Sequence, residues 1–179
     1  MDRPFLRAAY NAEADTYDER FRDVQWPKFE TFLGAAGEHL AGLDPILDVG
    51  CGTGLLTTYL AERGADEAEL IGVDLSEGML RACKARGGVV AQADMGRLPF
   101  RAQAFGAVVS VTVFRIIPTD DRRVLAEMAR VLRPGGRLVL SLLAHRDDGA
   151  LVNTLGAVGF RVEKRLRAGQ DVGYLATRR

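Results

Sequence analysis

Three glycines at alternate positions directly follow a short apolar segment, and this feature limits the fold more than any other part of the chain. Residues 46–49 are short and apolar enough for a buried strand, and Gly50, Gly52 and Gly54 come next. Glycine adopts backbone angles that other residues avoid, and it lets a ligand approach the main chain. A helix that begins near Thr53 would direct unpaired N–H groups at such a ligand. The segment predicts a tight strand-to-helix turn, either without a ligand or as the binding site of a nucleotide-bearing cofactor.

From residue 46 onward, predicted strands alternate with predicted helices. Apolar runs of strand length occur at 46–49, 69–74, 89–93, 105–113, 137–143, 160–166 and 172–177. Helices are expected at 53–63, after an N-cap at Ser76, at 119–132, and from Asp147 or Asp148 through Leu155. Such alternation is typical of a mostly parallel sheet covered on both faces, and the last two strands are expected to pair antiparallel.

The N-terminal residues are predicted to form helices that cover this sheet. Aromatic and apolar residues recur at mostly helical spacing in 5–23, which suggests one or two amphipathic helices. Pro27 is expected to interrupt them, and a second helix should follow over about 28–40. A length of 179 residues fits a single domain, with 1–43 as a helical lid and 44–179 as the cofactor-binding core.

Composition excludes several classes of protein. The chain carries 24 Lys and Arg against 24 Asp and Glu, so it lacks the positive field of a protein that binds DNA through its phosphates. Cys51 and Cys83 are too few for a disulfide framework or a zinc quartet, and we interpret both as free thiols in a reducing cytoplasm. No apolar run reaches membrane-spanning length. We therefore expect a cytoplasmic protein with no metal ion, no DNA and no membrane as partner.

The spacing of the glycines separates two classes of cofactor. The dinucleotide fingerprint Gly-x-Gly-x-x-Gly would need its third glycine at Leu55 or at Thr57, depending on the first glycine, and neither position holds one. A nicotinamide oxidoreductase thus becomes a remote alternative. The run Asp48-x-Gly50-x-Gly52-x-Gly54 instead resembles the first motif of class I S-adenosylmethionine-dependent methyltransferases.

The resemblance extends along most of the chain. Asp74, at the end of the second predicted strand, matches the acidic residue that in this family accepts hydrogen bonds from the two ribose hydroxyls. Asp94 and Met95 match the segment that reads the adenine ring. Residues 130–136 match a structural hallmark of the family, and residues 10–18 resemble the N-terminal segment of its small-molecule members, which are related to ubiquinone and menaquinone biosynthesis methyltransferases.

This resemblance implies a fold, a cofactor and a set of binding residues. The implied fold is α/β, a Rossmann-like three-layer sandwich whose seven-stranded sheet is mostly parallel with an antiparallel final strand. The implied cofactor is S-adenosylmethionine; Asp48 would help to hold its ammonium end, and Cys51 would contribute its backbone N–H. The predicted cofactor-binding residues are Tyr10, Tyr17, Asp48, Gly50, Cys51, Gly52, Gly54, Asp74, Leu75, Met79, Asp94, Met95 and Ser110.

The sequence defines catalytic residues less clearly than cofactor-binding residues. The sulfonium already makes the methyl carbon electrophilic, so the protein chiefly aligns a nucleophile and excludes water. Many relatives carry a His after the fourth strand, where this chain has Arg115, which cannot act as a base near neutral pH. Arg115 is either an anchor for a carboxylate or phosphate of the acceptor or a solvated side chain. His145, after the fifth predicted strand, is a candidate general base.

The predicted function is methyl transfer to a small-molecule acceptor. The acceptor pocket is expected to form from residues 1–30, the Arg115 loop and residues 144–148, because the connection after the fifth strand is short. The alternatives are a protein or RNA acceptor, or a cofactor-binding partner protein without catalysis. The local candidates for an RNA-binding patch are Arg161, Lys164, Arg165, Arg167, Arg178 and Arg179. Neither the acceptor nor the oligomeric state follows from the sequence.

Overall fold

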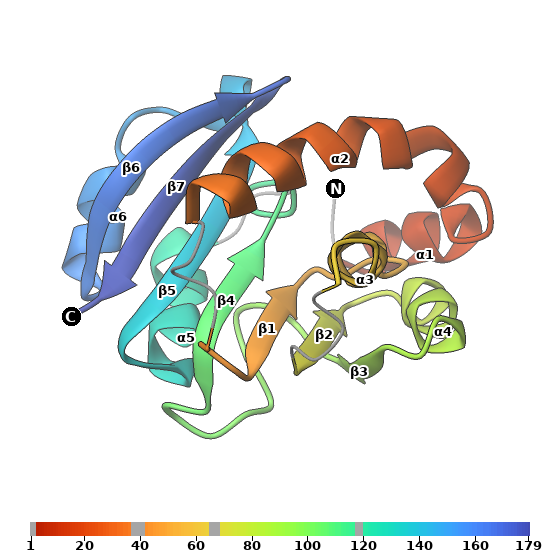
Figure 1. Cartoon of the computed structure of the whole chain (residues 1–179), viewed down its shortest axis with the longest axis horizontal. Coiled ribbons are helices and arrows are strands. Elements are labelled where there is room, and N and C mark those ends of the chain that lie inside the picture. Colours follow the sequence, from red (N-terminus) through yellow and green to blue (C-terminus); the bar gives the residue numbers. More distant parts are fainter. Residues whose placement is uncertain (1–2, 37–41, 65–68, 117–119) are drawn as a thin grey trace.

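A seven-stranded sheet forms the middle of the molecule. The computed structural model describes residues 3–36, 42–64, 69–116 and 120–179. The strands are β1 (Ile46–Val49), β2 (Leu70–Asp74), β3 (Val89–Gln92), β4 (Phe105–Ser110), β5 (Leu132–Leu143), β6 (Phe160–Ala168) and β7 (Asp171–Arg178). They lie in the order β3-β2-β1-β4-β5-β7-β6 (Figure 1). Strands β1 to β5 are parallel to one another, and β7 is antiparallel to both β5 and β6, which confirms the predicted sheet.

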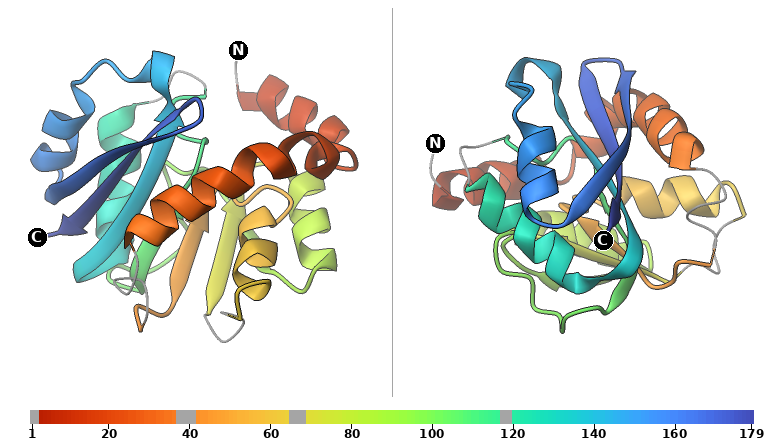
Figure 2. Two further views of the ribbon diagram at one scale, coloured as in Figure 1. Left: turned by 45° about the horizontal axis from the view of Figure 1, so that its top comes forward. Right: turned by 90° about the vertical axis from the view of Figure 1, so that its left-hand side faces the viewer.

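Helices cover both faces of the sheet. The helices α2 (Tyr17–Ala36), α3 (Leu55–Ala61) and α4 (Glu77–Ala85) lie on one face, whereas α5 (Asp121–Val131) and α6 (Leu151–Ala157) lie on the other (Figure 2). Phe29, Phe32 and Leu33 of α2 pack in one cluster with Leu55 and Leu56 of α3. A second cluster holds the apolar stripe of α5 against β4 and β5. The arrangement is the predicted three-layer α/β sandwich, since an apolar sheet must be covered on both faces.

The N-terminal helices lie across the carboxyl end of the parallel strands (Figure 1). Helix α1 (Arg3–Glu13) contacts α4, and α2 runs from there toward β5, β6 and β7. Pro27 lies inside α2 and does not interrupt it, so that prediction is wrong. Proline removes one helical hydrogen bond, but burial of the following Phe29, Phe32 and Leu33 keeps the helix intact. The predicted helix end at residue 40 lies outside the described residues.

Three further boundaries differ from the predictions. Strand β5 already begins at Leu132, which pairs with Phe105 across a register shift, although residues 133–136 were expected to form a turn. Helix α5 begins at Asp121 with Asp120 as its N-cap, and the predicted first turn around Pro118 lies outside the described residues. Strand β4 ends at Ser110, so that residues 111–113 belong to the following loop.

Neither Asp147 nor Asp148 caps α6 in the way the sequence suggested. Ala150 stands at the N-cap, and no side chain caps the helix. The Asp147 carboxylate instead accepts hydrogen bonds from Arg165 Nη2 at 2.7 Å and from the Tyr174 hydroxyl at 2.8 Å. The 3-10 helix η2 (Ala144–Arg146) precedes these residues. Within the described residues, no helix combines the length and apolar character needed to cross a membrane.

Candidate active site

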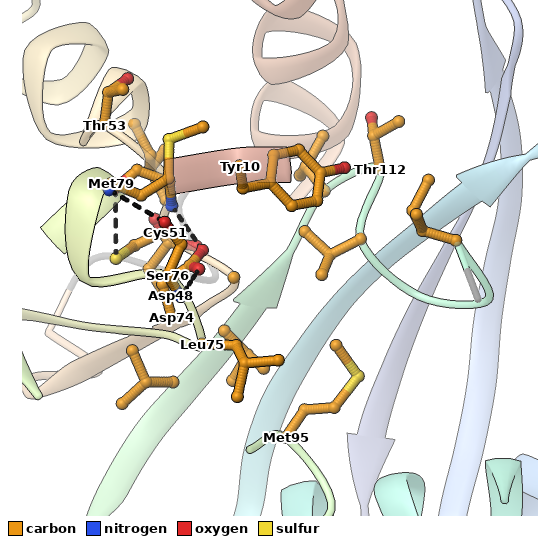
Figure 3. A pocket seen from close by; sticks show the side chains of 18 of the residues that line it. Tyr10, Asp48, Cys51, Thr53, Asp74, Leu75, Ser76, Met79, Met95 and Thr112 are labelled. Atoms are coloured by element: carbon orange, nitrogen blue, oxygen red, sulfur yellow. Dashed lines mark hydrogen bonds between the residues drawn. The ribbon is translucent and has the colours of Figure 1, made fainter. Parts of the chain in front are cut away.

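A cleft opens at the carboxyl end of the parallel strands, where sites of open α/β sheets lie. Its empty space amounts to about 1220 Å³, including the open mouth. The loops after β1, β2, β3 and β4 line it, and α1 and α2 close over it. Figure 3 shows Asp48 and Asp74 on one side of the cleft and Thr112 on the other, with Tyr10 between them.

The glycine loop curls onto the end of β2. Gly50, Gly52 and Gly54 have φ angles of 80°, 54° and 88°, in the left-handed region that favours glycine. The N–H groups of Gly50 and Cys51 both donate to the Val73 carbonyl, at 2.7 and 3.0 Å. The Cys51 N–H, predicted to face the cofactor, thus has an internal partner. Gly54 forms the N-cap of α3 and supplies no side-chain cap, so the first N–H groups of that helix have no capping side chain.

Asp74 connects the glycine loop to the start of α4. Its Oδ2 accepts from Gly52 N at 3.0 Å, and its Oδ1 accepts from Ser76 N at 2.8 Å. Burial raises the pKa of this carboxyl above its ordinary value, while the N–H groups of Ser76, Gly52 and Leu75 act in the opposite direction. Each carboxylate oxygen can accept a second hydrogen bond. Asp74 can therefore accept from a vicinal diol and keep the loop in place.

Asp48 is the second acidic residue of the cleft, and it is 5% exposed. Burial raises the pKa of its carboxyl well above the ordinary value, and the nearby Cys83 and Asp74 raise it further. A cationic ligand beside Asp48 would favour the ionised form and reverse this shift. The residue fits the predicted contact with an ammonium group.

Hydrogen bonds and an ion pair join the N-terminal helices to the segments that follow β1 and β2. Asn11 Oδ1 of α1 accepts from Ser76 Oγ at 2.7 Å and from Gly78 N at 2.8 Å. Asp18 of α2 accepts from the Thr53 hydroxyl and forms an ion pair with Arg86. These bonds hold α1 and α2 directly over the loops that follow β1 and β2.

Tyr10 and Tyr17 line the cleft beneath these helices, with ring centroids 6.5 Å apart in an edge arrangement. Burial raises the pKa of both hydroxyls, and the nearby carboxylates raise it further, so both stay protonated near neutral pH. Each hydroxyl can therefore donate a hydrogen bond into the cleft.

Most of the predicted cofactor residues line this one cleft. They are Tyr10, Tyr17, Asp48, Gly50, Cys51, Gly52, Asp74, Leu75, Met79, Asp94 and Met95. Gly54 and Ser110 are not among its lining residues. Ser110 is fully buried, and its hydroxyl donates to the Val49 carbonyl at 2.8 Å, so it ties β4 to β1.

The two predicted catalytic residues lie outside the cleft lining. Arg115 forms ion pairs with Asp121 at 2.6 Å and with Asp148 at 3.0 Å, and it donates to the Arg146 carbonyl at 2.8 Å. Its guanidinium thus joins the loop after β4 to α5 and to the loop after β5. His145 is exposed, and its Nε2 accepts from Arg146 Nε at 3.1 Å.

Residues 1–30 and the loop around Arg115 line the other half of the cleft, as expected for the acceptor pocket, whereas residues 144–148 are not among its lining residues. Sequence reasoning did not identify the individual side chains. Apolar side chains come from α1, α2 and the loop after β4: Leu6, Phe29, Val111, Val113 and Ile116. Gln25 and Thr112 add neutral polar groups there. Gln25 is 7% exposed, although glutamine is seldom buried, and no periodic signal in the sequence singles it out.

The residues of the first half fit S-adenosylmethionine. Asp74 offers acceptor positions for a ribose diol, and Leu75, Met79 and Met95 offer apolar contacts for a flat ring. The buried Asp48 offers a carboxylate whose ionised form a cationic group would stabilise. These acceptors and apolar contacts correspond to the ribose, adenine and methionine parts of that molecule.

Comparison with known proteins agrees with this fit. Residues 47–140 match the family described as "Methyltransferase domain". A tRNA (carboxymethyluridine(34)-5-O)-methyltransferase of Arabidopsis thaliana is 30% identical over 155 residues, covering 85% of this chain and 36% of that protein. A demethylmenaquinone methyltransferase of Symbiobacterium thermophilum is 34% identical over 146 residues, covering 75% and 57%. The chain thus spans less than two thirds of the length of these relatives.

Solved structures share the fold. A S-adenosylmethionine-dependent methyltransferase from Aquifex aeolicus superposes with a TM-score of 0.76 at 17% identity, over 94% of this chain and 98% of that one. At this identity the likeness establishes the architecture alone, whereas the family match covers more than half of the chain. The chain therefore belongs to the class I S-adenosylmethionine-dependent methyltransferases, with S-adenosylmethionine as its cofactor.

Proposed function

We propose that the protein transfers a methyl group to a small, largely apolar acceptor that binds between α2 and the loop after β4. The observation that carries this proposal is the lining of that half of the cleft. Phe29, Val111, Val113 and Ile116 are apolar, and Gln25 and Thr112 are neutral. Ligand sites for small molecules combine such apolar walls with a few polar groups.

The remaining site residues have binding roles in this proposal. S-adenosylmethionine supplies the electrophilic methyl group. Asp74 holds the ribose, Asp48 holds the ammonium end, and Asp94 accepts from the adenine amine. The walls of the cleft align the acceptor and exclude water, which are the main contributions of the protein to such a transfer.

Arg115 and His145 have other roles in this proposal. Arg115 positions the loop after β4 through its two ion pairs and does not contact the acceptor. His145 could serve as a base only if its exposed loop folded over the cleft, and Arg146 already occupies its Nε2. We therefore propose an acceptor atom that is nucleophilic without a general base from these two residues.

We further propose that residues 1–43 act as the lid of this site. The bonds of Asn11 and Asp18 to the loops after β1 and β2 support this role, because they hold α1 and α2 over the cleft. The free, buried thiols of Cys51 and Cys83 support a reducing compartment such as the cytoplasm.

An RNA acceptor is the second candidate, because several relatives are named tRNA methyltransferases. The basic residues on β6 favour the small acceptor instead. Arg161 pairs with Glu163, and Arg165 pairs with Asp147. Strand β6 also forms the edge of the sheet farthest from β1, β2 and β3. Phosphate binding would need unpaired cations near the cleft.

Labelled methyl transfer tests the proposal. The wild-type chain and Asp74→Ala are incubated with methyl-labelled S-adenosylmethionine and with separate small-molecule, RNA and protein fractions of a cell extract. We expect label in the small-molecule fraction with the wild type and background label with Asp74→Ala. Label mainly in RNA or protein would overturn the acceptor class. Cofactor binding without transfer to any fraction would indicate a partner protein without catalysis.

A further inference from the structure

A buried polar cluster lies behind the acceptor half of the cleft. Lys28 Nζ lies 3.0 Å from Asp171 Oδ1, and these side chains are 4% and 0% exposed. The Thr112 hydroxyl accepts from Lys28 Nζ at 2.9 Å and donates to Asp171 Oδ2 at 2.7 Å. Ser141 Oγ also donates to Asp171 Oδ2, at 2.8 Å. The four residues come from α2, the loop after β4, β5 and β7, so the cluster joins the lid to the sheet.

Thr112 is the member of the cluster that reaches the cleft. Its φ angle is 62°, a left-handed conformation that is rare for a β-branched residue. The backbone N–H of Thr112 donates to Ser141 Oγ at 2.9 Å, while its hydroxyl is held by Lys28 and Asp171. Such strain persists only where the surroundings fix the residue, and it is concentrated at functional sites.

The neighbours of Thr112 form the wall of the cleft. Val111 and Val113 both line it, on either side of Thr112 in the chain. Val113 also packs against the glycine loop, because a Cβ atom at Gly50 would lie 2.5 Å from both of its methyl groups. The conformation of Thr112 therefore determines how the acceptor wall sits against the cofactor loop.

We propose that Thr112 is a positioning residue for the acceptor, held in place by the buried Lys28–Asp171 pair and Ser141. This inference rests on the proposed function, since it concerns the wall against which the acceptor binds. The cluster suits the task because the hydrogen bonds of Thr112 to Lys28 and Asp171, and of Ser141 to Asp171, are directional, whereas apolar packing would tolerate several loop conformations. The cofactor half of the cleft does not use these four residues. The cluster should therefore affect acceptor alignment and leave cofactor affinity unchanged.

A purely structural role predicts a different outcome. If the cluster served only stability, its loss would lower the melting temperature and leave the loop and the reaction unchanged in the molecules that remain folded. A positioning role predicts a change confined to residues 111–116 and to the acceptor step. Hydrogen exchange of that segment separates the two and needs no acceptor.

Thr112→Val removes the hydroxyl at nearly constant volume, and Thr112→Ser retains it. We expect amide exchange of residues 111–116 to rise at least tenfold in Thr112→Val, with the dissociation constant for S-adenosylmethionine within threefold of the wild type. For the acceptor found by labelling, kcat/KM should fall at least tenfold, and Thr112→Ser should restore most of it. Thr154→Val, in α6, is the matched control and should change none of these quantities.

Ser141→Ala provides a second variant if Thr112→Val does not fold. Ser141 is fully buried and does not line the cleft, so it acts on the site only through Thr112 and Asp171. Unchanged exchange of residues 111–116 in both variants would overturn the proposal, as would a Thr112→Ser variant as impaired as Thr112→Val. A wild type that binds the cofactor but methylates nothing would instead refute the proposed function. Amide hydrogen exchange of residues 111–116 would still test whether Thr112 positions the loop.

Discussion

Val113 lies so close to Gly50 that a side-chain carbon at Gly50 would come within 2.5 Å of both Val113 methyl groups. Gly50→Ala must therefore displace either the glycine loop or the acceptor wall, and at φ 80° it adds backbone strain of about 1–3 kcal/mol. We expect the affinity for S-adenosylmethionine to fall at least thirtyfold, measured by isothermal titration calorimetry.

Gly52→Ala is the matched control for this prediction. Gly52 is also left-handed, at φ 54°, but a Cβ atom there would meet nothing within 4 Å. The affinity of Gly52→Ala for S-adenosylmethionine should fall by a factor several times smaller than that of Gly50→Ala. The double variant Gly50→Ala/Val113→Ala should recover part of the loss. Equal losses in the two single variants would show that backbone strain, not contact with Val113, controls the loop.

Replacement of Asp48 should separate stability from cofactor binding. The raised pKa means that folded, ligand-free protein keeps a proton on Asp48 where the unfolded chain has lost it. Folding stability therefore falls as pH rises from the ordinary aspartate pKa through the raised one. Asp48→Asn should remove this loss, and near neutral pH its Tm should rise by about 2–4 °C per kcal/mol gained.

The same variant should bind S-adenosylmethionine more weakly, because it lacks the carboxylate that we propose holds the ammonium group. Wild-type affinity should rise with pH through the Asp48 pKa, whereas Asp48→Asn should show a flatter profile. Thermal denaturation and calorimetry between pH 5 and 8 test both effects. Unchanged affinity in Asp48→Asn would remove Asp48 from the cofactor contacts.

Asn11 should control how fast the cofactor leaves. Asn11→Ala removes both bonds from α1 to the start of α4, and Gly78→Ala would place a Cβ atom 2.9 Å from Asn11 Cα. We expect both variants to release labelled S-adenosylmethionine about tenfold faster in a stopped-flow chase, with stability changed by about 1 kcal/mol. Glu77→Gln, which breaks only the exposed pair with Arg7, should be near wild type. A Gly78→Ala variant with normal release would contradict the assigned contact.

The Lys28–Asp171 pair should be sensitive to the loss of one partner. Lys28→Met leaves the fully buried Asp171 carboxylate without its cation and should cost about 3–5 kcal/mol in the free energy of unfolding. Lys28→Met/Asp171→Asn should lose less than the single variant, since no buried charge remains. Urea denaturation measures both, and Glu30→Gln, in an exposed pair with Arg63, should stay within about 1 kcal/mol. A double variant less stable than Lys28→Met would contradict this account.

Local patterns in the sequence predicted the cofactor half of the cleft. The glycine spacing, Asp74 after the second strand and the N-cap Ser76 are each patterns within a short stretch of sequence. The structure has the strands β1 and β2 and the helix α4 where these patterns predicted them. The alternation of strands and helices likewise predicted the sheet and its antiparallel last strand. Which individual residues contact S-adenosylmethionine remains a prediction, and the variants above test it.

The sequence predicted two segments of the acceptor half, residues 1–30 and the loop around Arg115. Its individual residues could not be predicted, because their placement depends on contacts between distant segments. Lys28 and Thr112 are 84 residues apart, and Thr112 and Asp171 are 59 apart. A lysine beside Pro27 indicated a helix start, whereas the helix passes through the proline and buries Lys28. Arg115 was a candidate for the acceptor, yet its guanidinium is taken by Asp121 and Asp148, which only the folded loops bring together.

The cleft is divided between separate stretches of the chain. Residues 48–56 and 73–95, with Tyr10 and Tyr17, hold the predicted cofactor contacts, whereas Gln25, Phe29 and residues 111–116 line the other half. Mutations in the second set can therefore change the acceptor while the machinery for the methyl donor stays intact. A laboratory search for new acceptor preferences should vary Val111 and Ile116, and leave untouched Thr112, its buried partners and Val113, which packs against Gly50.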